Sequence, residues 1–159
     1  MPGLITLNDF GGDFSAWYEH IYDCFCEDFL RNPLAEFQGK RMGLKRHPLT
    51  DDKEATFYHI THEGQDEQNR EPNMRRMERI LWVKHLIRNA DHASLMVWRN
   101  KRKNDENILI YHPKEGYLIV LADRGNYILP WTAYLVEYEW KRKKLEAEYQ
   151  AYKKAEAAK

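Results

Sequence analysis

The chain has 159 residues, of which 43% are hydrophobic and 31% are charged, and this composition excludes a disordered chain. Its length supports one sizeable core rather than two. Lysine plus arginine balance aspartate plus glutamate at 25 each, so net charge does not support a nucleic-acid-binding or membrane-binding class, and any basic surface must come from local clustering.

No stretch of the sequence approaches the roughly 20 consecutive apolar residues of a membrane-spanning helix, and the first residues lack a basic segment followed by an apolar run. We therefore expect a soluble, cytoplasmic protein without a membrane partner. Cys24 and Cys26 are one residue apart in a helical pattern, which is poor geometry for a disulfide and too few thiols for structural zinc. We expect both thiols to be reduced and the protein to use no metal and no cofactor.

The first half of the chain predicts two helices and one strand. Apolar residues recur at spacings of three and four over residues 13–30, which predicts the first helix. Residues 36–49 lack a helical period and predict a weak strand or a loop. Residues 55–61, ATFYHIT, are rich in aromatic and β-branched types and predict a strand. A second helix is predicted from Pro72 and Asn73 to Asn89.

The second half of the chain predicts an antiparallel meander followed by a helix. Four apolar runs separated by turn residues are SLMVWRN, ILIYH, YLIVLAD and YILPWTAYLVE. Pro130 cannot donate to a sheet ladder and predicts a bulge or an edge in the last run. The expected fold is α+β, with N-terminal helices packed on a four-stranded antiparallel meander and a C-terminal helix. Residues 1–152 form the single expected domain, and residues 153–159 form a frayed tail.

Four side chains are candidates for a phosphate site. Thr132 and Tyr134 are two residues apart in the last strand, so both leave the same face, and Arg124 lies in the preceding turn. Hydroxyls orient phosphate, arginine grips it with two donors, and a histidine such as His59, with an ordinary pKa of about 6.5, transfers protons near neutral pH. The ordinary alternatives are that His59 is a half-buried, hydrogen-bonded histidine and that threonine and tyrosine are good strand residues.

Further candidates are less specific. His62 lies three residues after His59, a spacing that does not indicate a metal pair on a strand. Arg75, Arg76 and Arg79 cluster at the start of the second helix, where either anion binding or pairing with nearby acids explains them. The run from Arg99 to Lys103 could follow a nucleic-acid backbone, although such a hairpin tip is usually only solvated.

The segments FYHITHEG, REPNMRRMERILWVKHLI, ILIYHPKEGYLIVLADRGNYILPWTAYLVE and KRKKLEAEYQAY, in this order, resemble a family encoded by phages and integrated mobile elements. That family belongs to the barnase, EndoU, colicin and RelE-like nuclease superfamily, and the resemblance covers residues 56–152. It implies that the chain is a metal-independent endoribonuclease. Such an enzyme would act as a toxin or a phage effector in the cytoplasm of the bacterial host. In such an enzyme the 2′-hydroxyl attacks the adjacent phosphate and leaves a 2′,3′-cyclic phosphate.

The resemblance also implies a role for each catalytic candidate. His59 would be the general base or acid, Arg124 would stabilise the charged phosphorane, and Thr132 with Tyr134 would position the phosphate. The residues expected to bind substrate are His62, Arg76, Arg79 and Arg99. Pro130 and Trp131, just before Thr132, depart from the family's pattern and would alter the strand geometry that places the hydroxyls.

A second hypothesis is a noncatalytic protein-binding module or inhibitor on a nuclease-like scaffold. The neutral net charge, the ten tyrosines and the charged C-terminal helix favour it. A nuclease for free RNA would need a positive surface. The expected partner is RNA, with a cognate inhibitor or a ribonucleoprotein as further partners. The sequence leaves open a narrow substrate, docking on a ribonucleoprotein, and a scaffold without nuclease activity.

Overall fold

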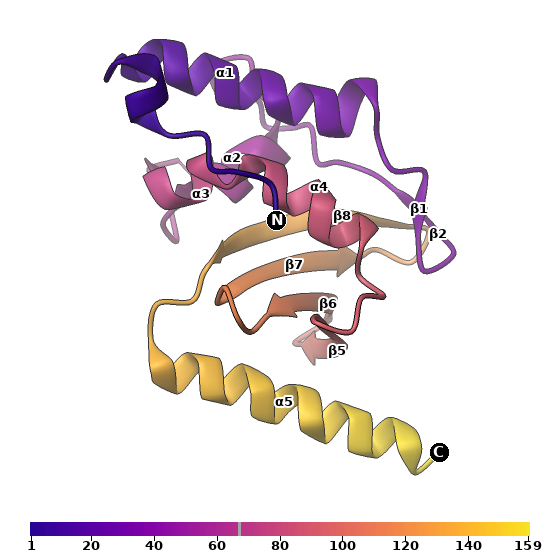
Figure 1. Cartoon of the computed structure of the whole chain (residues 1–159). Helices are drawn as coiled ribbons and strands as arrows, with labels where there is room; N and C mark the ends of the chain where they lie inside the picture. The colour runs from indigo at the N-terminus through magenta and orange to yellow at the C-terminus, as the bar shows by residue number, and fades with distance from the viewer. Residues whose placement is uncertain (67) are drawn as a thin grey trace.

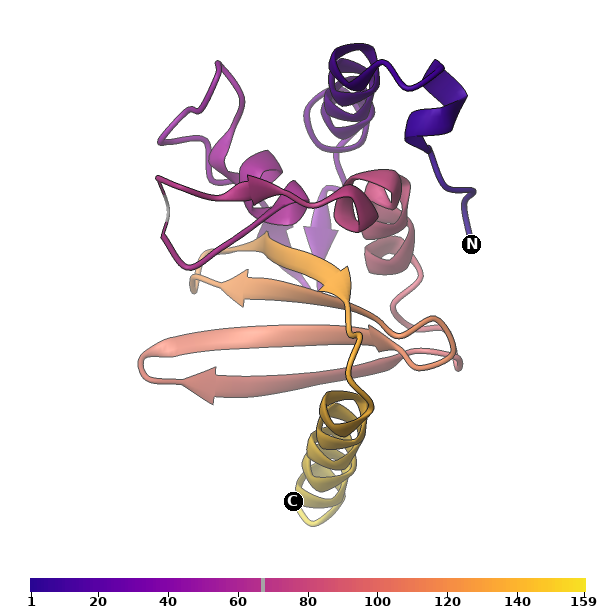
Figure 2. The ribbon, with the colours of Figure 1, turned by 90° about the vertical axis from the view of Figure 1, so that its left-hand side faces the viewer.

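A six-stranded sheet separates two unequal layers of helices in the computed structural model, which describes residues 1–66 and 68–159 (Figure 1). The helical elements are η1 Leu7–Phe10, α1 Phe14–Cys26, η2 Glu27–Arg31, α2 Ala55–Thr61, α3 Met74–Glu78, α4 Ile80–Arg88 and α5 Glu139–Ala157. The strands are β1 Glu36–Phe37, β2 Lys40–Met42, β3 His62–Glu63, β4 Glu71–Pro72, β5 Met96–Arg102, β6 Asp105–His112, β7 Tyr117–Asp123 and β8 Tyr127–Leu135. Helices α1 to α4 cover one face of the sheet, and α5 lies alone on the other (Figure 2).

The main sheet has the strand order β1-β2-β8-β7-β6-β5, and it is mixed. Strands β5 to β8 are consecutive antiparallel neighbours, but β2 pairs with β8 in parallel, with Arg41 opposite Tyr127 and Met42 opposite Ile128. The predicted four-stranded antiparallel meander is therefore wrong as a description of this sheet. Residues 36–42, expected as a weak strand or a loop, form a hairpin whose second strand pairs with the first two residues of β8, Tyr127 and Ile128.

The strand predicted for residues 55–61 is also wrong, because these residues form helix α2. Six of its seven residues are buried. The threonine hydroxyls find backbone partners in the helical form: Thr56 donates to the carbonyl of Lys45, and Thr61 donates to the carbonyl of Phe57 four residues earlier at 2.7 Å. Burial and these hydrogen bonds outweigh the β-propensity of the segment.

The two predicted long helices are present with interruptions. Helix α1 starts after Asp13, whose carboxylate accepts from the N–H of Ala16, and the turn that follows it, η2, continues as π-helix to Arg31. The second helix divides into α3 and α4 at Arg79, whose backbone leaves helical geometry. The predicted bulge at Pro130 is confirmed, since β7 pairs Leu121 with Pro130 and Val120 with Thr132, which leaves Trp131 as the extra residue.

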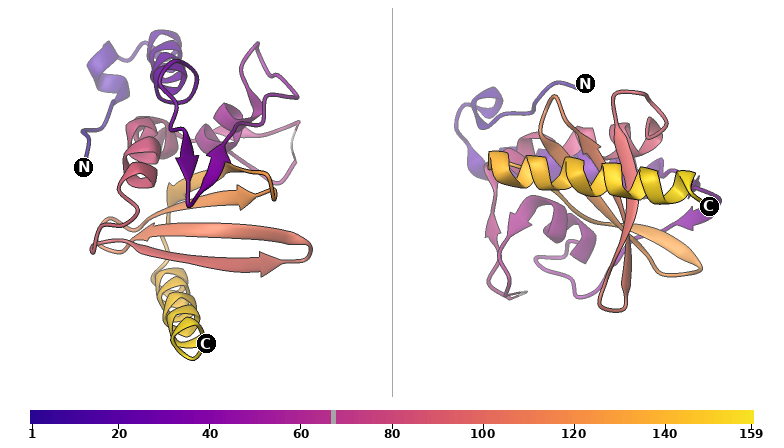
Figure 3. Two further views of the ribbon diagram at one scale, coloured as in Figure 1. Left: turned by 90° about the vertical axis from the view of Figure 1, so that its right-hand side faces the viewer. Right: turned by 90° about the horizontal axis from the view of Figure 1, so that it is seen from below.

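Apolar side chains form two cores of unequal size, one on each side of the sheet. The larger core lies under the N-terminal helices and includes fully buried Trp17, Phe25 and Phe57. The smaller core lies under α5, which crosses the strands with Leu145 as its buried residue (Figure 3). Because Leu145 is the buried residue of α5, polar side chains line part of the space between this helix and the sheet. Within the described part of the chain, no helix has the length and apolar character to cross a membrane.

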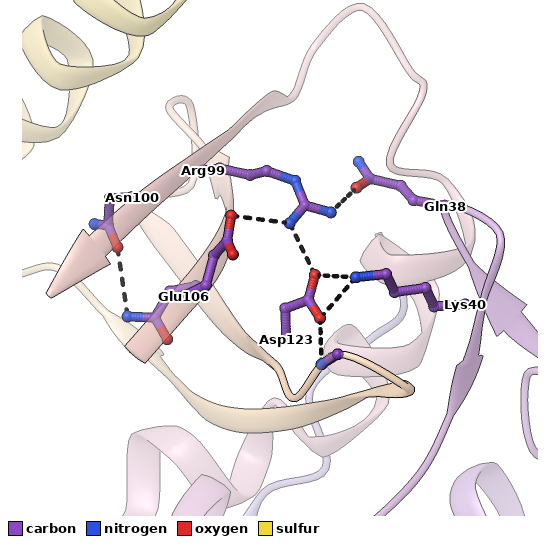
Figure 4. A network of polar contacts seen from close by, with 8 residues as sticks. Gln38, Lys40, Arg99, Asn100, Glu106 and Asp123 are labelled. Carbon is purple, nitrogen blue, oxygen red and sulfur yellow. Dashed lines mark hydrogen bonds and ion pairs between the residues drawn. The ribbon is translucent and has the colours of Figure 1, made fainter. Parts of the chain in front are cut away.

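A network of charges around Asp123 joins both ends of the strand order (Figure 4). Lys40 of β2 lies 2.8 Å from the Asp123 carboxylate, and Arg99 of edge strand β5 lies 2.9 Å from it. Arg99 also donates to the side chain of Gln38 at 2.9 Å, and the N–H of Gly125 donates to Asp123 at 2.9 Å. We call these residues the Asp123 network. It ties the β1–β2 hairpin to the opposite edge of the sheet.

Candidate functional site

The side chain of Arg76 brings together three regions that contain predicted site residues. Its Nη1 donates to the carbonyl of His62 at 2.7 Å, to the carbonyl of His59 at 3.2 Å and to the Thr132 hydroxyl at 3.4 Å. The guanidinium carbon lies 5.2 Å from the centre of the Tyr134 ring. Arg76 therefore caps the C-terminal carbonyls of α2 and holds them against the part of β8 that has no strand partner on that side. Burial lowers the pKa of this guanidinium.

Tyr134 lies against two cations. The ammonium of Lys141, from the first turn of α5, donates to the Tyr134 hydroxyl at 2.9 Å and lies 4.7 Å from the ring centre, while Arg76 contacts the same ring. Such contacts between cations and an aromatic ring are favourable, and they fix the phenol in place. The tyrosine pairs with Leu118 on β7 and belongs to the side of the sheet that α5 covers.

A groove of about 390 Å³ lies between α5 and the sheet, and we call it the α5 groove. Its charged and polar lining consists of Asn100, Arg102, Asn107, Tyr134, Lys141, Lys144 and Glu148. Three cations therefore face one carboxylate, and that carboxylate accepts a hydrogen bond from Asn100. Leucine and valine side chains form the apolar part of the lining, and Trp140 contributes an aromatic ring. The groove is thus locally positive in a chain with zero net charge.

His59 and Arg124 meet at a different ring. The His59 imidazole lies 4.8 Å from the Trp131 ring in an edge-on arrangement, and the Arg124 guanidinium and the Lys45 ammonium lie 5.3 Å and 5.4 Å from the same ring. The bulge at Trp131 turns this indole away from the regular alternation of β8. His59 is only 2% exposed, so its imidazole has little access to solvent, whereas Arg124 also pairs with Asp105 at 3.5 Å.

His62 is buried and held on a neighbouring ring. Its imidazole stacks on Tyr58 at 3.9 Å, and its Nδ1 lies 2.9 Å from the Thr61 hydroxyl. Burial, and then the positive charges of Arg70 and Arg76, lower the pKa of His62 to about 4. The ring is therefore neutral at physiological pH and supplies no positive charge to a phosphate.

Arg79 and Arg99 make contacts that stabilise the fold. Arg79 pairs with Glu78 at 2.8 Å and covers the ring of Trp82, and Arg99 belongs to the Asp123 network. Of the predicted substrate-binding residues, the structure brings Arg76 and the backbone of His62 to Thr132 and Tyr134. The contacts of Arg79 and Arg99 lie elsewhere in the fold.

Sequence reasoning missed Lys141 and the α5 groove. The available signal was the run of four basic residues from Lys141 to Lys144, which directly follows the aromatic residues Tyr138 and Trp140. A basic run on a helix is ordinarily a solvated face, so its pairing with Tyr134 required the fold to be seen.

The chain matches no protein-family model, no curated protein and no solved structure. The resemblance to the nuclease superfamily therefore rests on the sequence segments alone and stays a prediction. Among the described residues, no group of three or more histidine, cysteine, aspartate or glutamate side chains could hold a metal ion.

Proposed function

We propose that this chain binds RNA in the α5 groove and does not cleave it. The groove would contact the phosphate backbone of the RNA. The observation that carries this proposal is the placement of Lys141 on the Tyr134 ring, with Lys144 and Arg102 lining the same groove as Tyr134. A track of cations beside aromatic and apolar side chains suits a nucleic-acid strand, whose phosphates need positive charge and whose bases need flat contacts. The resemblance of residues 56–152 to RNA-cleaving proteins favours RNA over other polyanions.

Substituting Lys141 with alanine should weaken RNA binding by roughly tenfold and reduce the salt dependence by about one phosphate contact. Its ammonium lines the groove and donates to Tyr134, so the substitution removes one charge and releases the phenol. The measurement is fluorescence anisotropy of a labelled single-stranded RNA over a range of salt concentrations.

The matched control is Lys143→Ala, because Lys143 is exposed on the same helix and does not line the α5 groove. It removes the same formal charge, and we expect a much smaller loss of affinity. If the folded wild-type protein fails to bind RNA at low salt, or if both substitutions have the same effect, the proposed function is wrong. A cognate inhibitor or a ribonucleoprotein surface that covers the groove would compete with the labelled RNA.

A second candidate is a metal-independent endoribonuclease, as a toxin or effector in the cytoplasm of a bacterial host. The observation that favours it is the contact of both His59 and Arg124 with Trp131, the residue before Thr132. Cleavage would form a bond between the 2′-oxygen and phosphorus while the bond from phosphorus to the 5′-oxygen breaks. The 2′-hydroxyl proton would pass to a base, and the departing 5′-oxygen would take up a proton to leave as a hydroxyl. Since His59 is 2% exposed, this reaction also requires its imidazole to become accessible to the RNA.

The two candidates differ in one assay. Purified protein is incubated with total RNA and transfer RNA in excess EDTA, beside His59→Ala and Arg124→Ala variants. The ribonuclease candidate requires cleavage that both substitutions abolish. The binding proposal requires intact RNA together with measurable affinity, and we expect this second result.

A further inference from the structure

Two aromatic side chains at the start of α5 are exposed to an unusual degree. Trp140 is 64% exposed and Tyr138 is 63% exposed, with ring centres 6.3 Å apart and planes inclined by 24°. Large apolar side chains that stay in water beside a polar site usually mark a contact surface. Trp140 also lines the α5 groove, in which Lys141 and Lys144 follow it one and four residues later.

This combination distinguishes between two forms of nucleic acid. A duplex presents phosphates to a protein but keeps its bases stacked on one another, so cations alone can hold it. An unpaired strand offers base faces as well, and each base that stacks on an aromatic ring contributes about 1–3 kcal/mol. The aliphatic part of the groove lining, Leu109, Leu118, Val120 and Leu145, has no hydrogen-bonding side chains and suits base faces rather than sugar or phosphate.

We infer that the α5 groove takes a single-stranded segment, with one base stacked on Trp140 and its phosphates at Lys141 and Lys144. This inference rests on the proposed function and names its substrate class. Trp140 supplies the preference for unpaired bases, and the two lysines supply affinity that is independent of sequence.

The experiment compares a labelled single-stranded RNA with the same sequence annealed to its complement, using wild-type protein and three variants. We expect the wild type to bind the single strand roughly tenfold more tightly than the duplex. Trp140→Ala should lose roughly tenfold in affinity for the single strand and little for the duplex. Trp140→Phe keeps a ring and should retain most of the preference, which separates stacking from a folding defect.

The matched control is Phe14→Ala, because Phe14 is 42% exposed on α1, in the helical layer on the opposite face of the sheet. It should leave both affinities unchanged. A second readout is intrinsic fluorescence: the single strand should quench wild-type emission more than emission of Trp140→Phe.

The outcomes separate the inference from the proposed function. If neither RNA binds, the proposed function fails, and the inference fails with it. If both forms bind equally and Trp140→Ala behaves as the wild type, the groove binds RNA through charge alone, and only the inference is overturned. Selective loss of single-strand affinity in Trp140→Ala supports both.

Discussion

Replacing Arg76 with alanine should lower the free energy of unfolding by about 2–4 kcal/mol. The guanidinium donates to two carbonyls at the end of α2 and to the Thr132 hydroxyl, and alanine would remove this donor from three part-buried acceptors. The ring of Tyr134 would also lose one of its two cations. Urea unfolding followed by circular dichroism at neutral pH measures the loss.

Arg75 provides the control for this prediction. It is the neighbouring residue on α3, its side chain is 65% exposed, and its ion pair with Glu137 is long at 3.9 Å. Arg75→Ala should therefore change the free energy of unfolding by less than about 0.5 kcal/mol. Equal losses in both variants would show that Arg76 is a surface arginine in energetic terms and that its hydrogen bonds to α2 contribute nothing.

Long segments in which apolar residues recur at a regular spacing could be predicted from the sequence, whereas helix α2 could not. Trp17, Ile21 and Phe25 repeat every four residues and all lie in the core, as the pattern of residues 13–30 indicates. Residues 55–61 are too short to show a period, and their aromatic and β-branched types favour a strand. In the helical form they donate a hydrogen bond to Lys45 and accept one from Arg76, which lie 11 and 17 positions from their partners in the chain, outside the segment itself.

The parallel pairing that makes the sheet mixed could not be predicted from the sequence either. Strand β2 has three residues, Lys40 to Met42, and pairs in parallel with β8, with Arg41 opposite Tyr127, 86 positions later in the chain. Neither composition nor alternation in so short a segment encodes such a partner. The consecutive strands β5 to β8 were accessible because local turn residues separate them, and the rule that neighbouring strands pair then gives their order.

The candidate site was found in part, because residue type suggests chemistry but does not reveal contacts. The charge of Arg76 made it a candidate for substrate binding. In the structure its side chain caps the end of α2 and contacts Tyr134. The charge of Arg99 suggests the same chemistry, yet this side chain pairs with Asp123 in the fold. Lys141 was overlooked because a lysine among other lysines on a helix has no distinguishing pattern, and only α5 packing brings it to Tyr134.

Acid should lower the free energy of unfolding by protonating Asp123. Burial alone would raise the pKa of this carboxyl group, but hydrogen bonds from Lys40, Arg99 and the N–H of Gly125 outweigh burial and lower the pKa from 3.8 to about 2. Because the pKa is lower in the folded than in the unfolded state, the stabilisation is complete above about pH 4 and is lost as the pH falls toward 2. At 1.36 kcal/mol for each pKa unit, the loss is about 2 kcal/mol.

The test compares the wild type with Asp123→Asn by urea unfolding at about pH 6 and about pH 2.5. Asparagine keeps the shape of the side chain but removes the charge that holds Lys40 and Arg99, so the variant should be less stable than the wild type at the higher pH. At the lower pH the gap should shrink to roughly a third, because part of the folded-state carboxyl groups is protonated there. Asp105→Asn is the control, because Asp105 is 64% exposed and should give the same small difference at both pH values. If the gap between wild type and Asp123→Asn is the same at both pH values, the Asp123 carboxylate does not hold the two ends of the sheet together through its charge.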